Sequence, residues 1–183
     1  MTSNKKSPAI GVVGGLILGS AAVVAFIGTW EGGRDKRGDS VVYADKLAGG
    51  LPTVCAGLTR HITKTPIIVG QKWSAEKCDY EEAKAIATVQ MQLIKCFTRK
   101  PSQHVFDAAT SHAWNFGVSA TCSSGAMRAW NEGQWSLGCQ RIYRTDSGRP
   151  SWSYVTQGDK KVFVQGLANR RQAEYRMCMG VKP

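Results

Sequence analysis

Two carboxylates and a hydroxyl early in the chain have the residue types needed for acid–base chemistry. Glu31 follows the apolar stretch 25–30 and precedes two glycines, so we expect it at the end of a helix. Burial beside apolar side chains would favour the protonated form that a general acid needs. Asp45 and Thr53 fall in or beside predicted strands, where a carboxylate and a hydroxyl can orient a water. This pairing suits glycoside hydrolysis, although the same residues also fit a solvated helix end and ordinary strand positions.

Other catalytic classes lack their sequence signatures. The chain contains no Gly-x-Ser-x-Gly elbow of a serine hydrolase and no Gly-x-x-x-x-Gly-Lys-Ser/Thr phosphate loop. Its cysteines are widely spaced, and His61, His104 and His112 are scattered, which argues against a zinc site. We therefore expect neither a metal nor a cofactor.

The elements that must position Glu31, Asp45 and Thr53 indicate an α+β fold. We expect a small β lobe over about residues 31–72 and a larger helical lobe over about residues 73–183. Ser74 is a suitable N-cap for the first long helix, which we expect to end at Lys100. The predicted strands are 41–43, 53–55 and 65–69, the later helices are 102–114, 123–132, 134–143 and 167–178, and solvated loops are expected at 31–40 and 145–161.

The N-terminus carries a membrane-length apolar segment. Residues 7–30 form an uncharged run of 24 residues after Lys5 and Lys6. As a helix this run would be about 36 Å long, enough to cross a hydrocarbon core of roughly 30 Å with the N-terminus in the cytoplasm. We therefore divide the chain into a cytoplasmic basic segment (1–6), a signal-anchor segment (7–29) and a folded domain (30–183). A cleaved signal peptide and a permanent anchor are the alternatives.

The cysteine content agrees with export of the domain, and the net charge indicates the class of partner. Six cysteines in an oxidising compartment fit up to three disulfides, whose pairing the sequence leaves open. The net charge of +11 favours an anionic partner such as nucleic acid, anionic lipid or a cell-wall polymer. Because basic residues are scattered among acidic ones rather than clustered, apart from Arg170 and Arg171, we do not expect nucleic-acid binding.

Four segments carry a resemblance to a known family. They are residues 43–45 with 50–59 (YAD and GLPTVCAGLT), 73–78 (WSAEKC), 114–117 (WNFG) and 166–174 (GLANRRQAE). In this order they resemble the phage-type lysozymes, glycoside hydrolase family 24, over about residues 30–180. The resemblance implies a lysozyme-like fold and a muramidase, which cuts the β-1,4 bond between N-acetylmuramic acid and N-acetylglucosamine in peptidoglycan.

The resemblance also implies roles for individual residues. The family's Glu-Asp-Thr triad falls on Glu31, Asp45 and Thr53. Glu31 would protonate the leaving oxygen, Asp45 would hold or activate the water, and Thr53 would help to place that water. Arg171 matches an arginine that pairs with the catalytic glutamate. The family generally inverts, which requires carboxyl groups roughly 6.5–9.5 Å apart.

One departure from the family concerns the spacing of the two carboxylates. The separation from Glu31 to Asp45 is longer than is usual, and the extra residues fall at 34–39. Asp39 is therefore a rival water-holding residue. We prefer Asp45 because it follows Tyr43, as in the family pattern.

The Gly- and Ala-rich N-terminus resembles signal-anchor-release endolysins within this family. These enzymes are exported by the host secretion machinery, held inactive at the inner membrane, and released into the periplasm on depolarisation. The resemblance implies a monomeric endolysin that lyses the host cell. Residues 20–30 cannot both span lipid and pack as the helix carrying Glu31, so release would bring Glu31 to Asp45. The alternative is a non-catalytic, membrane-tethered peptidoglycan-binding protein with the lysozyme fold.

Overall fold

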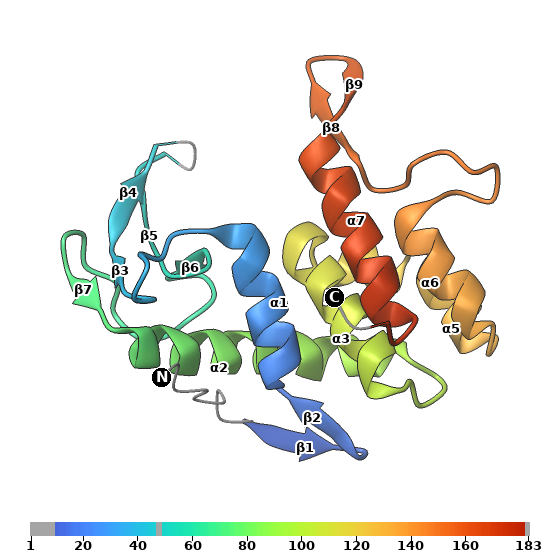
Figure 1. Ribbon diagram of the computed structural model, residues 1–183, viewed down its shortest axis with the longest axis horizontal. Coiled ribbons are helices and arrows are strands. Elements are labelled where there is room, and N and C mark those ends of the chain that lie inside the picture. The colour runs from blue at the N-terminus through green and yellow to red at the C-terminus, as the bar shows by residue number, and fades with distance from the viewer. Residues whose placement is uncertain (1–9, 47–48, 182–183) are drawn as a thin grey trace. The chain divides into compact units, whose positions relative to one another are not determined.

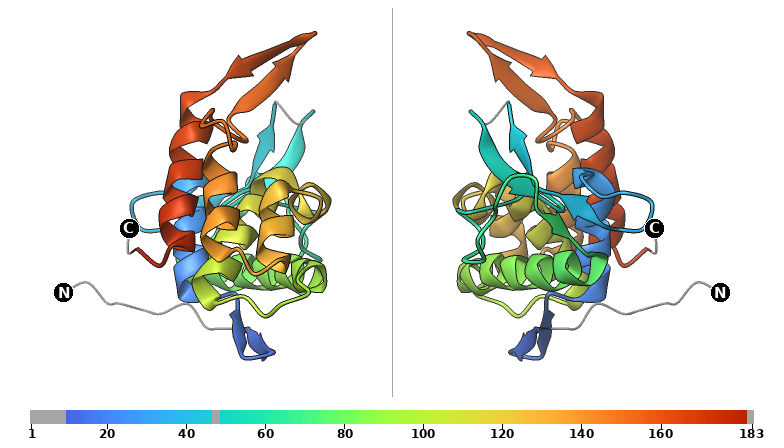
Figure 2. Two further views of the ribbon diagram at one scale, coloured as in Figure 1. Left: turned by 90° about the vertical axis from the view of Figure 1, so that its right-hand side faces the viewer. Right: turned by 90° about the vertical axis from the view of Figure 1, so that its left-hand side faces the viewer.

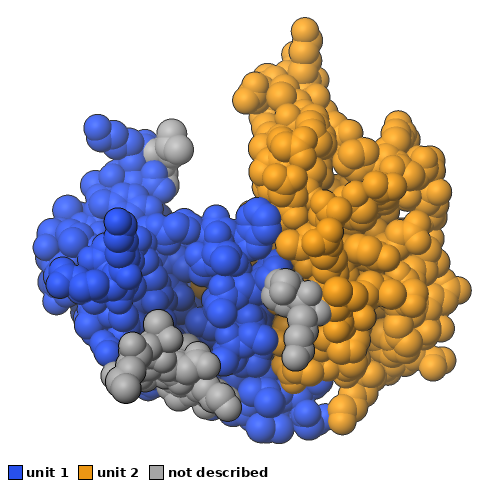
Figure 3. All heavy atoms as spheres, viewed as in Figure 1, with its two compact units in different colours: residues 1–90 blue, residues 91–183 orange. Residues whose placement is uncertain are grey.

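The structure is a computed structural model that describes residues 10–46 and 49–181. The chain divides into two compact units, residues 1–90 and residues 91–183 (Figure 3). The first unit contains short strands and two helices, and the second is mainly helical, so the predicted α+β class is confirmed (Figure 1). The elements of the first unit are β1 (Gly11–Val13), β2 (Leu16–Leu18), α1 (Ala21–Glu31), β3 (Ser40–Val41), β4 (Tyr43–Asp45), β5 (Leu51–Val54), β6 (Leu58–Thr59), β7 (Lys72–Trp73) and most of α2 (Ala75–Leu93).

Residues 10–31 form a hairpin followed by a helix. Strands β1 and β2 pair antiparallel around Gly14 and Gly15, both of which have positive φ, a conformation that glycine adopts without a steric penalty. Helix α1 begins after Ser20, whose Oγ accepts a hydrogen bond from the Val23 backbone N–H at 3.2 Å. Four apolar residues of α1 are buried in the folded chain, namely Val23, Val24, Phe26 and Ile27.

The predicted signal-anchor helix over residues 7–29 is not seen in this structure. Its described part is the β1–β2 hairpin and most of the 11-residue helix α1, because the glycine turn breaks the run. Within residues 10–46 and 49–181, no helix is both long and apolar enough to cross a membrane. Helix α1 also runs through the predicted boundary between residues 29 and 30. The predicted basic segment 1–6 and residues 7–9 lie outside the described residues.

The β region of the first unit consists of two small antiparallel sheets. One pairs β3 with β7, and the other has the strand order β4-β5-β6. The predicted strand 41–43 is divided between β3 and β4, which belong to different sheets, and the predicted strand 53–55 is present as β5 with shifted bounds. The strand predicted at 65–69 is wrong, since those residues form a bend and an irregular segment. Pro66 has no backbone N–H to donate to a strand ladder.

Helix α2 begins as predicted and ends earlier. The Ser74 Oγ accepts from the Lys77 backbone N–H at 3.3 Å, which confirms Ser74 as the N-cap. The helix ends at Leu93 rather than Lys100, because a 3-10 turn, η1 (Ile94–Cys96), follows and Phe97 is extended. A disulfide from Cys78 to Cys55 joins the first turns of α2 to the loop after β5.

The second unit packs helices that are cross-linked by two disulfides. Cys96 is bonded to Cys122 and Cys139 to Cys178, so all six cysteines pair. Four helices lie within a few residues of their predicted bounds, and α4 was not predicted. The helices are α3 (Gln103–Phe116), α4 (Val118–Cys122), α5 (Gly125–Asn131), α6 (Trp135–Tyr143) and α7 (Gln165–Cys178).

The loop predicted at 145–161 contains part of a second hairpin. Strand β8 (Tyr154–Gln157) pairs antiparallel with β9 (Lys160–Phe163), and the hairpin extends beyond the start of α7 (Figure 2). All eight strand residues are exposed. The loop prediction is therefore wrong over these residues: neither face of the hairpin is buried, so no alternation of apolar and polar residues marks the strands.

Candidate active site

Glu31 is the last residue of α1, as predicted, and is half-buried. The helix ends because Gly32 follows with φ of 65°, in the left-handed region that favours glycine. A Cβ added to Gly57 would lie 3.8 Å from the Glu31 Oε2. The loop between β5 and β6 therefore passes close to the Glu31 carboxyl group.

Asp45 and Thr53 lie on neighbouring strands (Figure 1). In the β4–β5 register Asp45 is opposite Leu51, and Thr53 is opposite Tyr43. Asp45 and Thr53 are therefore diagonal neighbours on one face of the ladder, a relation that separates residues by about 7–8 Å. Thr53 is buried, and its Oγ1 donates to the Leu51 carbonyl oxygen at 3.1 Å. The ladder thus presents a carboxyl group and a hydroxyl group on the same face.

Asp39, the rival water-holding residue, has structural partners. Its Oδ2 lies 2.8 Å from the Lys72 Nζ, and its Oδ1 accepts from the Ala75 backbone N–H at 3.1 Å, at the start of α2. The hydrogen bond from Lys72 and the one from Ala75 stabilise the charged form and lower the pKa of Asp39. Its carboxylate thus links β7 to α2.

Two charged residues that sequence reasoning missed lie beside the Glu31 segment. Glu82 of α2 has a side chain only 1% exposed, and its Oε2 lies 2.6 Å from the Arg34 Nη2. The Glu82 Oε1 accepts from the Ala56 backbone N–H at 2.7 Å. Burial raises the pKa of Glu82, and the hydrogen bond and charge of Arg34 oppose that rise. The prediction of a solvated loop at 31–40 is therefore wrong for Arg34, whose side chain is 22% exposed.

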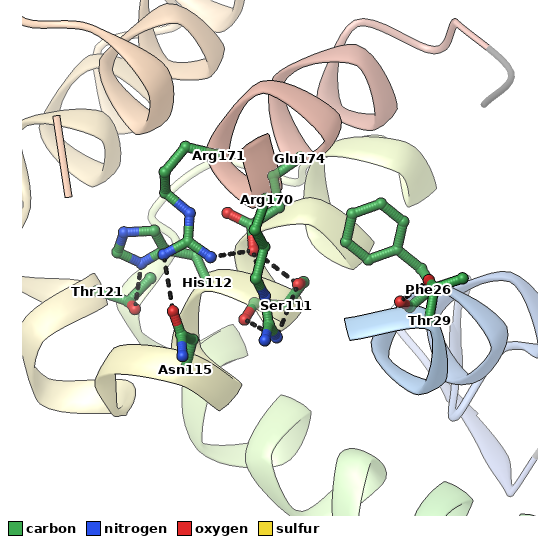
Figure 4. Close-up of polar contacts among 9 residues, drawn as sticks. All are labelled: Phe26, Thr29, Ser111, His112, Asn115, Thr121, Arg170, Arg171 and Glu174. Atoms are coloured by element: carbon green, nitrogen blue, oxygen red, sulfur yellow. Dashed lines mark hydrogen bonds and ion pairs between the residues drawn. The ribbon is translucent and has the colours of Figure 1, made fainter. Parts of the chain in front are cut away.

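Arg171 lies at the centre of a buried polar cluster in the second unit (Figure 4). Its Nη2 lies 2.6 Å from the Glu174 Oε1, and its Nη1 donates to the Asn115 Oδ1 at 3.1 Å. The Ser111 Oγ donates to the same Glu174 oxygen at 2.7 Å, and Arg170 contacts that oxygen at 3.4 Å. Arg171 is not a surface charge, because its side chain is fully buried and is held by side chains of α3 and α7.

Aromatic rings complete the setting of Arg171. Its guanidinium lies 4.7 Å from the centroid of the Phe116 ring. The Phe116 ring contacts those of His112 and Trp152 at centroid distances of 5.1 Å and 5.0 Å, and His112 meets Trp152 edge-on at 4.6 Å. These contacts fix the plane of the guanidinium within the second unit.

The predicted site residues are divided between the two units. Glu31, Asp45 and Thr53 lie in residues 1–90, and Arg171 lies in residues 91–183. A hollow of about 650 Å³ in the second unit is lined by residues of α5, α6 and the loop after α6, and none of these four residues lines it. Within residues 10–46 and 49–181, no cluster of three or more His, Cys, Asp or Glu residues could bind a metal ion.

Comparison with known proteins places the chain in a family. Residues 29–174 match the phage lysozyme family. The SAR-endolysin of Pseudomonas phage phiKMV is 27% identical over 141 residues, covering 77% of this chain and 79% of that protein. The endolysin from Escherichia coli O157:H7 phage FAHEc1 is similar with a TM-score of 0.69 and 25% identity, covering 88% of this chain and 93% of that one. The muramidase domain of SpmX from Asticaccaulis excentricus shares the fold, with a TM-score of 0.68 and 22% identity, covering 90% of this chain and 97% of that one. The chain belongs to the phage lysozyme family, and its lysozyme-like fold confirms the resemblance read from its sequence.

Proposed function

We propose that the protein is an endolysin that hydrolyses the β-1,4 bond between N-acetylmuramic acid and N-acetylglucosamine in peptidoglycan. The observation that carries the proposal is the family match over residues 29–174, which includes a glutamate at the end of α1 and the β4–β5 ladder. The ladder supplies a carboxyl and a hydroxyl on one face that can hold a water, and Glu31 supplies the second carboxyl group that glycoside hydrolysis requires.

In this proposal Glu31 is the general acid that protonates the leaving glycosidic oxygen. Asp45 holds and activates the water, and Thr53 helps to place it, with inversion at the sugar carbon. Asp45 is preferred to Asp39 because the Asp39 carboxylate is engaged by Lys72 and the Ala75 amide.

Arg171 is the proposed electrostatic partner of the catalytic glutamate. Its guanidinium is preorganised by Glu174 and Asn115, so little conformational freedom is lost when it acts. The buried carboxylate of Glu174 compensates part of the charge of Arg171, which makes burial of the guanidinium tolerable.

Export and release belong to the same proposal. The uncharged run of residues 7–30 is long enough to span the inner membrane, and in the folded domain residues 10–31 form the β1–β2 hairpin and α1. The two conformations exclude each other, so an anchored chain would lack the helix that ends at Glu31. We expect host secretion machinery to insert the chain, and release to deliver it to the periplasm as a monomer. Cleavage after Ala22 in the released chain would instead identify a signal peptide.

The decisive experiment compares the full chain with its Glu31→Gln variant on purified peptidoglycan. Turbidity loss and new reducing ends are followed together, and Glu132→Gln, which neutralises an exposed carboxylate after α5, is the matched control. Loss of a general acid should lower the rate by about 10²–10⁴-fold, while the control should keep full activity. Equal rates for wild type and Glu31→Gln would refute the role of Glu31.

A second candidate function is non-catalytic binding to peptidoglycan. The longer separation of Glu31 and Asp45 relative to the family favours it, since a displaced carboxylate would fail to hold the water. This candidate predicts that wild type sediments with peptidoglycan without releasing reducing ends, and that Glu31→Gln binds equally well.

A further inference from the structure

Two backbone segments that flank the proposed catalytic residues lie against each other. The segment 32–34 follows Glu31, and the segment 55–57 follows β5, which carries Thr53. A Cβ added to Gly33 would overlap the Cys55 carbonyl oxygen, so the two backbones are in direct contact. The position of Glu31 relative to the β4–β5 ladder therefore depends on how these segments are held together.

The Glu82 carboxylate bridges the two segments from α2. One oxygen binds the Arg34 guanidinium at 2.6 Å, and the other accepts from the Ala56 backbone N–H at 2.7 Å. Arg34 is also bound by Asp79 at 2.7 Å, one turn earlier on the same helix. Each carboxylate oxygen of Glu82 thus serves a different segment.

Ser40 supplies a second bridge between the same segments. Its Oγ donates to the Gly33 carbonyl oxygen at 2.7 Å and accepts from the Cys55 backbone N–H at 2.9 Å. The bridges formed by Glu82 and Ser40 lie on successive residues of both segments. Together they restrict sliding and rotation of one segment against the other.

The residues between Arg34 and Ser40 form a closed turn. The Asp35 backbone N–H donates to the Asp39 carbonyl oxygen at 2.8 Å, and the Asp35 Oδ1 accepts from the backbone N–H groups of Arg37 and Asp39 at 2.8 and 3.0 Å. This turn contains most of the residues that lengthen the separation from Glu31 to Asp45. It loops out and returns the chain, so that Arg34 and Ser40 both reach the contact.

We infer that Arg34 and Glu82 are positioning residues that hold Glu31 at the spacing from Asp45 and Thr53 that hydrolysis requires. The inference rests on the proposed function and deepens it. A buried ion pair contributes little net stability compared with packed apolar side chains, so its value lies in fixing geometry. A misplacement of about 1 Å at a catalytic group lowers the rate by about 10²-fold, so the pair has a measurable effect on catalysis.

The test uses Glu82→Gln in the full chain, because glutamine can still accept from the Ala56 N–H but cannot pair with the charge of Arg34. We expect kcat on soluble peptidoglycan fragments to fall between about 10- and 10²-fold with KM within about twofold. The matched control is Asp79→Asn, which removes the more exposed partner of Arg34 and leaves the Ala56 contact intact. This control should lower kcat much less.

A double-variant cycle separates positioning from a loss of folded protein. If Glu82 acts through Glu31, Glu82→Gln should not lower the residual activity of Glu31→Gln any further. The same fold-loss in both backgrounds, or a rise in KM alone, would overturn the inference. Full activity of Glu31→Gln alone would refute the proposed function itself, which is a separate result. Should Glu82→Gln fail to fold, Arg34→Lys enters the same cycle with the same expected outcomes. Lysine keeps the positive charge but lacks the planar guanidinium that binds Asp79 and Glu82 through two separate nitrogens. This substitution leaves the contact between Glu82 and Ala56 in place.

Discussion

Lowering the pH should destabilise the protein through one buried histidine. The Thr121 hydroxyl donates its proton to the Gly117 carbonyl oxygen at 3.0 Å, so it accepts from the Nδ1–H of His112 at 2.8 Å. The other ring nitrogen, Nε2, is buried and has no hydrogen-bond partner among the described residues. Burial lowers the pKa of His112 well below its usual value, and the charges of Arg171 and Arg170 lower it further.

The size of the effect follows from proton linkage. At pH values above the unfolded-state pKa of about 6.5, His112 is neutral in the folded and the unfolded chain, so it does not change the free energy of unfolding. Below that pKa the unfolded chain binds a proton at His112 and the folded chain does not, so the free energy of unfolding falls as the pH falls. Between pH 7.5 and 5.5 the free energy of unfolding should drop by about 1.4 kcal/mol, which corresponds to about 3–6 °C in Tm for a chain of this size.

The assay is the Tm of the full chain at both pH values by circular dichroism, for wild type and for His112→Phe. The variant keeps a ring beside Trp152 and should lose this part of the pH dependence, while His61→Gln, which changes an exposed histidine, should behave as wild type. The NMR shift of the His112 ring protons should stay constant over the same interval. Equal pH-dependent losses of Tm in wild type and His112→Phe would refute the reasoning, as would titration of the His112 ring near pH 6.5.

Three substitutions test other parts of the fold by denaturant unfolding. Gly33→Ala places a methyl group against the Cys55 carbonyl oxygen at φ of +83°. It should lower the free energy of unfolding by several times the roughly 1 kcal/mol expected for Gly14→Ala, where φ is also positive but nothing lies within 4 Å. Similar losses in the two variants would contradict this. Replacing both Cys139 and Cys178, 39 residues apart, by alanine should cost about 4 kcal/mol through the loop entropy of the unfolded chain, and a loss under about 1 kcal/mol would show that this constraint is unimportant. Ile27→Ala removes a side chain that is 1% exposed and should cost about 2–5 kcal/mol, whereas a negligible loss would mean that α1 is not integral to the fold.

The expected helix bounds 102–114, 123–132, 134–143 and 167–178 agree with α3, α5, α6 and α7 within a few residues. One-sided apolar burial does not explain this for every helix, because α3 is buried over nine consecutive residues and the buried residues of α7 are mostly charged. The β8–β9 hairpin has no buried face, and only the Gly158-Asp159 turn between two β-branched and aromatic runs could have indicated it.

The N-terminal segment could not be assigned from composition alone. An uncharged run satisfies a bilayer and a protein interior equally well, since both remove apolar side chains from water. The structure uses Val23, Val24, Phe26 and Ile27 as buried residues of α1, as expected for the helix that carries Glu31. In the proposed release, the membrane and the protein interior would compete for the same residues, so α1 would form only after the segment leaves the membrane.

Asp45 and Thr53 were recognisable because they lie within short, ordered motifs, and Glu31 because it follows an apolar stretch and precedes two glycines, but the structural role of Asp39 was not. The contacts of Asp39 are with Asp35, in the turn that closes between them, and with Lys72 and Ala75, which follow much later in the chain. Long-range partners leave no periodicity in a single sequence, and the same is true of Glu82 and Arg34. A longer loop between two carboxylates therefore need not displace them: where the added residues close on themselves and the flanking residues are bridged, the spacing in the sequence and the spacing in the site become independent.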